Sequence, residues 1–68
     1  MSYAIHVREV HPHAHEYVLA YDIDGREQAE RVVRSLATSF PRHGPGATSG
    51  RYWFVSPSGY FQIWSELD

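Results

Sequence analysis

Three histidines within five residues are the feature of this chain that is best suited to chemistry. His11, His13 and His15 occupy alternate positions of the segment His-Pro-His-Ala-His. On extended backbone, alternate side chains lie on one side about 6–7 Å apart, close enough for neutral imidazoles to share Zn²⁺, Ni²⁺ or Cu²⁺. A divalent transition metal is therefore the one cofactor that the sequence suggests.

The same segment has a simpler interpretation as a polar hairpin loop. Structural zinc sites usually include cysteine thiolates, and this chain has no cysteine and no H-E-x-x-H arrangement. Pro12 removes a backbone donor and favours extended geometry at His11, as expected where a strand ends. We prefer the loop and keep metal binding as the alternative.

The sequence contains no recognised arrangement of residues for an enzyme active site. None of the serines lies in a G-x-S-x-G nucleophile elbow. Asp22 and Asp24 are explained by a strand end and a helix cap without a bound cation. Arg42 and His43 lie in a glycine-rich segment that lacks the spacing of a phosphate-binding loop. We therefore expect no catalytic activity.

The elements on both sides of the histidines predict a β-hairpin. Residues 3–10 and 16–23 alternate apolar and polar side chains, the pattern of half-buried strands. The histidine segment then forms the connection between the two strands.

A helix is predicted over residues 25–39. Asp24 and Glu27 form a variant of the capping box, and Pro41 ends the helix. The apolar side chains follow at helical spacing, and they are Ala29, Val32, Val33, Leu36, Ala37 and Phe40.

The last third of the chain predicts a crossover loop and a second hairpin. Residues 41–50 contain two prolines and three glycines, a loop composition. Strands at 51–56 and 60–65 follow, joined by the turn residues Pro57, Ser58 and Gly59. The expected fold is a single α+β domain over residues 1–68, with the order β-β-α-β-β, one four-stranded antiparallel sheet and one helix packed on one face.

The second hairpin is too apolar for a sheet with one covered face. Two assignments of the side chains to the faces of the sheet are possible. In the first, Trp53, Val55, Phe61 and Ile63 face the helix, and in the second they face away from it. We prefer the first, in which the uncovered face carries the complementary set, which is Tyr52, Phe54, Tyr60 and Trp64. Such a patch exceeds what soluble monomers usually expose, so we expect it to pair with a second copy. The alternatives are a ligand or partner protein, a wrapping by the helix and the 41–50 loop, or a strongly coiled sheet.

Size, composition and charge agree with this interpretation. A chain of 68 residues without cysteine has a small core and commonly needs a metal or a partner for stability. Its net charge is −2 and its six arginines are scattered, which argues against nucleic acid. Stacking of single-stranded nucleic acid on the aromatic face, near Arg8 and Arg51, is a weaker alternative.

Taken together, these features predict a small soluble homodimerising interaction module. The chain begins without the charged and apolar regions of a secretory signal and has no long apolar segment, so we expect a cytoplasmic protein that does not contact membranes. The sequence resembles no family motif.

Overall fold

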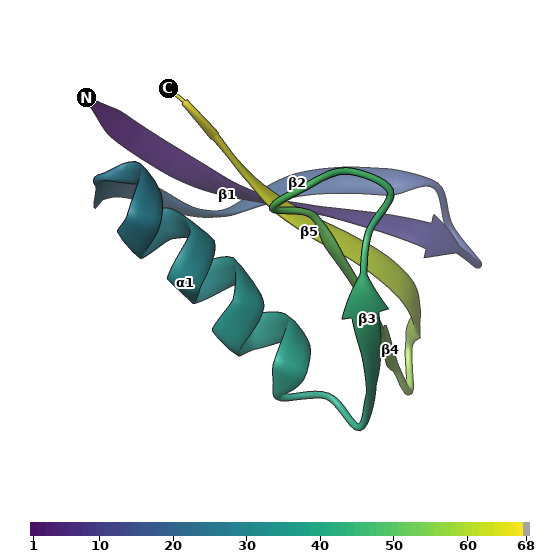
Figure 1. Cartoon of the computed structure of the whole chain (residues 1–68). Helices are drawn as coiled ribbons and strands as arrows, with labels where there is room; N and C mark the ends of the chain where they lie inside the picture. Colours follow the sequence, from purple (N-terminus) through teal and green to yellow (C-terminus); the bar gives the residue numbers. More distant parts are fainter. Residues whose placement is uncertain (68) are drawn as a thin grey trace.

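Two long antiparallel hairpins form where the alternating segments predict them. The computed structural model describes residues 1–67 (Figure 1). The first hairpin joins β1 (Ser2–His11) to β2 (His15–Asp24), and the second joins β4 (Tyr52–Ser56) to β5 (Gly59–Leu67). β1 also pairs with β5, so that the two hairpins share one sheet. The hairpin predictions are confirmed.

The prediction of four strands is wrong, because residues 1–67 form one helix and five antiparallel strands in a single sheet. The additional strand, β3 (Arg42–Pro45), lies within the predicted loop and pairs with β4 at the end of the order β2-β1-β5-β4-β3. Proline is tolerated on an edge strand because one side of its backbone needs no donor. Gly44 is required there, since a Cβ would lie 2.7 Å from the Trp53 indole.

The helix α1 (Arg26–Thr38) lies within one residue of its predicted bounds at both ends. The predicted capping box is wrong: Asp24 belongs to β2, and Gly25 precedes the helix with φ 92° and without a side-chain cap. A tight strand-to-helix junction at positive φ favours glycine over a capping side chain. Across residues 1–67, the structure contains no helix with the length and apolarity needed to traverse a bilayer.

Small helical residues let α1 lie close to the sheet. Ala29, Val33 and Ala37, spaced four residues apart, are fully buried against it. The strands complete the core with Ile5, Val7, Phe54, Phe61 and Ile63.

In the second hairpin, the side chains that share a face differ from both predicted assignments. Ser56 pairs with Gly59, so the turn contains two residues instead of the predicted three. Because the turn is one residue shorter, every side chain of one strand lies on the opposite face, relative to its partner strand, from the predicted one. Phe54 therefore lies opposite Phe61 on the helix side, while Trp53 lies on the other face.

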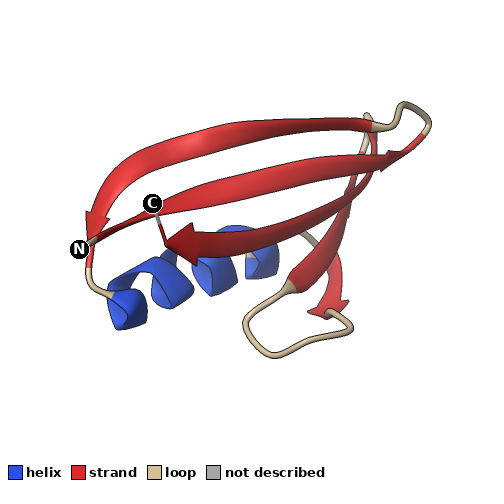
Figure 2. Cartoon of the chain, turned by 90° about the horizontal axis from the view of Figure 1, so that it is seen from above, coloured by secondary structure: helices blue, strands red, loops and turns tan. Residues whose placement is uncertain are grey.

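The helix is too short to cover the face of the sheet on which it packs. Its 13 residues span about 20 Å, whereas the ten residues of β1 and of β2 each span about 33 Å. Figure 2 shows α1 along one part of these strands, while the rest of each strand continues past it toward the hairpin tip. The inner face near the tip is left without a helix over it.

The burial of the core predicts a graded loss of stability. Ile63 is 1% exposed, so Ile63→Val should lower the free energy of unfolding by about 0.5–1.5 kcal/mol, measured by urea denaturation. Val10→Ala, at a 44% exposed position, should change it by less than about 0.5 kcal/mol. Equal losses for the two variants would contradict this core.

Candidate functional site

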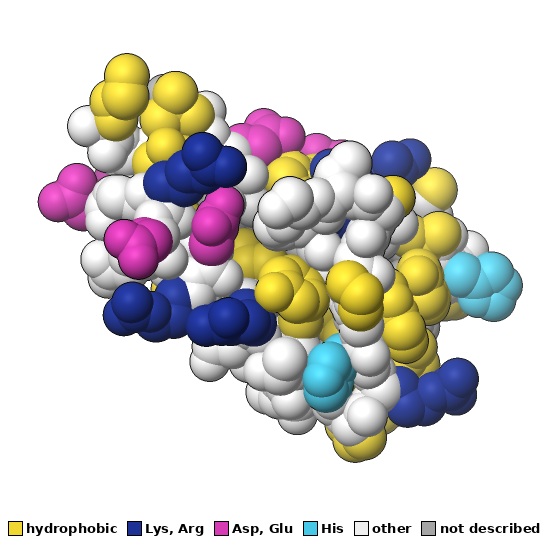
Figure 3. Space-filling view, viewed as in Figure 1, with side chains coloured by type: hydrophobic (Ala, Val, Ile, Leu, Met, Phe, Trp, Pro, Cys, Tyr) yellow, Lys and Arg dark blue, Asp and Glu magenta, His cyan; other side chains and the backbone are white. Residues whose placement is uncertain are grey.

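The core opens to solvent at the end of the sheet that α1 leaves uncovered. The opening is a groove of about 320 Å³ with an apolar lining, which we call the apolar groove. Its large side chains are Tyr17, Leu19, Leu36, Phe40, Phe54 and Phe61. Figure 3 shows the molecule from the side of β3, with hydrophobic side chains gathered in the right half of the view around β3 and β4.

Three strands and the end of the helix position these side chains. Phe54 and Phe61 stack at 5.2 Å between ring centroids, and Phe40, just after the helix, stacks on Phe54 at 4.3 Å. β2 supplies the opposite wall, where Tyr17 is 40% and Leu19 is 49% exposed. The groove therefore has a floor of stacked aromatic rings beside a half-exposed strand.

The sequence interpretation missed this groove. The sequence pattern places Leu36 and Phe40 on the apolar stripe of the helix and residues 16–23 in a half-buried strand, and it indicates no opening between them. The signal that they form an opening is the difference in length between a helix of about four turns and strands of about 33 Å.

The predicted aromatic face is divided between the two sides of the sheet. Tyr52 and Phe54 lie on the helix side, where Phe54 belongs to the core and Tyr52 packs against it. Tyr60 and Trp64 lie on the opposite side, because they alternate with the core residues Phe61 and Ile63 along β5. The structure does not bring these four side chains together as one surface.

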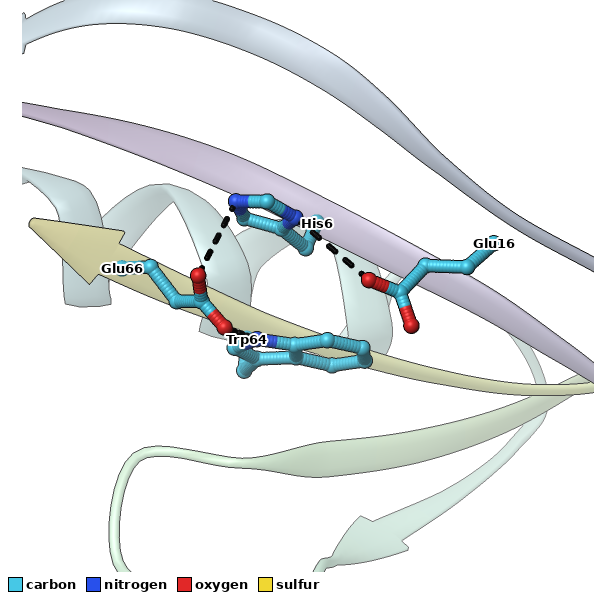
Figure 4. A network of polar contacts seen from close by, with 4 residues as sticks. All are labelled: His6, Glu16, Trp64 and Glu66. Carbon is cyan, nitrogen blue, oxygen red and sulfur yellow. Dashed lines mark hydrogen bonds and ion pairs between the residues drawn. The ribbon is translucent and has the colours of Figure 1, made fainter. Parts of the chain in front are cut away.

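On the face opposite the helix, the chain's own side chains cover Trp64. The Arg51 guanidinium lies 4.0 Å from the centre of the Trp64 ring, and His6 stacks with that ring at 5.7 Å. The indole Nε1 donates to Glu66 Oε1 at 2.9 Å, and Glu66 Oε2 lies 3.5 Å from His6 Nε2 (Figure 4). Trp64 is consequently 7% exposed, which leaves little of its ring available to a nucleobase.

The histidines of the hairpin tip do not converge. The His13 backbone N–H donates to Glu9 Oε2 at 3.3 Å, and the His15 ring lies 5.6 Å from the Tyr17 ring. In residues 1–67, no three side chains of histidine, aspartate or glutamate form a group that could hold a metal ion. Metal binding through His11, His13 and His15 stays a prediction, for which thermal melting with stoichiometric Zn²⁺ is the direct measurement.

A second cleft, of about 310 Å³, lies between α1 and the loop before β4. Its lining includes Glu27, Arg31 and Arg34, and Glu30 in the same wall pairs with the Arg26 Nε at 3.2 Å. Charges of both signs alternate along it, so it favours neither an anion nor a cation.

The cover over Trp64 is testable by fluorescence. Arg51→Ala, made in a Trp53→Phe background that leaves Trp64 as the single tryptophan, should raise acrylamide quenching because the guanidinium no longer shields the ring. The lost cation–π contact should cost about 0.5–1 kcal/mol of unfolding free energy. Arg8→Ala is the control, and an unchanged quenching constant for Arg51→Ala would contradict the stacked arrangement.

Comparison with protein-family models, with curated proteins and with solved structures gave no match for this chain. A functional proposal for this chain therefore rests on the geometry of the molecule. Within that geometry, the apolar groove is the surface where buried side chains continue into solvent without a cover.

Proposed function

We propose that this chain is a non-catalytic, self-associating interaction module of the cytoplasm, which pairs with a second copy through the apolar groove and the exposed side of β2. The observation that supports it is the continuity between core and groove: Phe54 and Phe61 are 7% exposed, while Leu19 beside them is 49% exposed. Covering such a surface is favourable because each half-exposed leucine that becomes buried contributes roughly 1 kcal/mol.

The exposed apolar side chains of β2 favour a second copy as the partner. Tyr17, Leu19 and Tyr21 on this strand are 40%, 49% and 66% exposed. In a two-fold pair, each copy contributes the same half-exposed strand and the same groove, so that side chains and opening can cover one another. The face opposite the helix offers less, because Arg51 and His6 already pack on Trp64.

The chemistry of the groove supports binding in place of catalysis. Apart from the phenol of Tyr17, its polar side chains are Ser56 and Ser58, whose hydroxyl oxygens lie 2.9 Å apart within the hairpin turn. The Ser58 backbone N–H also donates to Ser56 Oγ at 3.2 Å. These hydroxyls are typical of a turn, whereas a nucleophile needs an adjacent base.

Two leucines with nearly equal exposure provide a matched test. Leu19→Lys places a charge at the proposed contact, and Leu67→Lys places the same charge at a 52% exposed position outside the groove. Sedimentation equilibrium at tens of micromolar should show a dimer for the wild type. Leu19→Lys should raise the dimer Kd by at least about tenfold, equivalent to 1.4 kcal/mol.

Leu67→Lys should leave the Kd within about twofold of the wild type, which is close to the ±0.5 kcal/mol of ordinary surface substitutions. A wild-type monomer at every concentration, or equal effects of the two lysines, would overturn the proposal. Far-ultraviolet circular dichroism of both variants checks that the fold is retained.

A further inference from the structure

Within residues 1–67, the two edges of the sheet differ in their readiness to pair. β2 is a ten-residue edge, and its segment Tyr17–Tyr21 carries no charged side chain. β3 at the other edge has four residues, with a charged Arg42 at its start and Pro45 at its end. Short length, charge and proline are the devices that protect edges from pairing, and β3 has all three.

We propose that β2 pairs antiparallel with β2 of a second copy, centred on Tyr17, so that the two sheets become continuous. This inference rests on the proposed self-association and specifies its geometry. The unpaired backbone N–H and C=O groups of β2 would then bond to the same groups of the partner.

The register follows from the symmetry of the pair and from the regularity of β2. A two-fold axis perpendicular to the sheet keeps each residue opposite one on the same face, so Tyr17 must oppose an inward-facing residue. The ladder of β2 with β1 is regular from His15 to Val18, and irregular between Val18 and Ala20 and between Ala20 and Ile23. Centring on Tyr17 opposes residues 15–19 and reaches the irregular part only at Leu19, whereas centring on Val18 extends the contact through Ala20 and Tyr21.

Charge excludes a third register, the one centred on Leu19. With Tyr17 at the centre, Glu16 lies opposite Val18 of the partner subunit, and no carboxylate opposes a carboxylate within residues 15–19. Centring on Leu19 would place Glu16 opposite Asp22 of the partner subunit, and like charges directly opposite one another destabilise a strand pair.

This pairing also covers the apolar groove. Tyr17 and Leu19 line the groove, and His15 lies on the same side because its ring contacts Tyr17 at 5.6 Å. Two copies would bring both tyrosine rings together at the centre, with His15 and Leu19 of opposite copies beside them. Aromatic cross-strand pairs of this kind stabilise sheets by about 0.2–1 kcal/mol each.

The assembly closes at two copies. The opposed residues 15–19 form a ladder about 17 Å long, at the end of β2 next to the hairpin tip. Once these residues of both copies are paired, the edges that remain are the two protected β3 strands and the irregular, acidic ends of β2 at Asp22 and Asp24.

Disulfide trapping tests the register in a chain that has no cysteine of its own. Glu16→Cys and Val18→Cys, mixed and oxidised at a concentration where the wild type is dimeric, should form a mixed disulfide, because opposed Cβ atoms lie about 4.5–5.5 Å apart. Each variant alone should form disulfide at least several-fold more slowly, since its thiols are diagonal neighbours about 7–8 Å apart. His43→Cys on β3 is the control and should not cross-link above background.

Amide hydrogen exchange of the unmodified protein gives a second measurement that does not depend on the variants. Protection of residues 15–19 should rise with protein concentration, and that of β3 should not. A wild-type dimer without the mixed disulfide and without this protection would overturn the edge pairing and leave self-association intact. A wild-type monomer would overturn both.

Discussion

The difference in length between the helix and the strands is the constraint on which the rest of the structure depends. Thirteen helical residues cover about 20 Å of strands that extend for about 33 Å. Where Ala29, Val33 and Ala37 meet the sheet, the core is closed. Beyond the helix end, the same inner face continues as the apolar groove, so the proposed contact surface is the part of the core that one short helix cannot reach.

The other face of the sheet shows how this chain closes an aromatic surface without a second layer. Arg51 lies over the Trp64 ring, and the Trp53 ring stacks with Tyr60 at 5.9 Å. Trp53 also covers the glycine of β3 at the sheet edge. Aromatic and guanidinium planes bury one another with few atoms, which suits a domain too small for a helix on each side.

How much the sequence could predict depends on the range of the interactions involved. The hairpin strands and α1 were predictable because period-2 and period-3.6 patterns report which side chains are buried. β3 was not, since four residues with glycine and proline become a strand through pairing with β4, a contact that no local pattern encodes. Which side chains of the second hairpin share a face depends on whether Gly59 belongs to the turn or to β5. Because Gly59 is part of β5, Tyr52 and Phe54 lie on one face of the sheet and Tyr60 and Trp64 on the other.

The histidine segment connects the first hairpin and lies next to the proposed pairing edge. Its outer members, His11 and His15, are the last residue of β1 and the first of β2, so the segment ends one strand and begins the proposed pairing edge. The close approach of the His11 carbonyl to Gly59, where any Cβ would collide, brings the two hairpin turns together at the same end of the sheet. The imidazole of His15 extends the aromatic surface of Tyr17. In the proposed dimer, His15 of each copy lies beside Leu19 of the other copy, so a histidine that first suggested a metal becomes part of the contact between the copies.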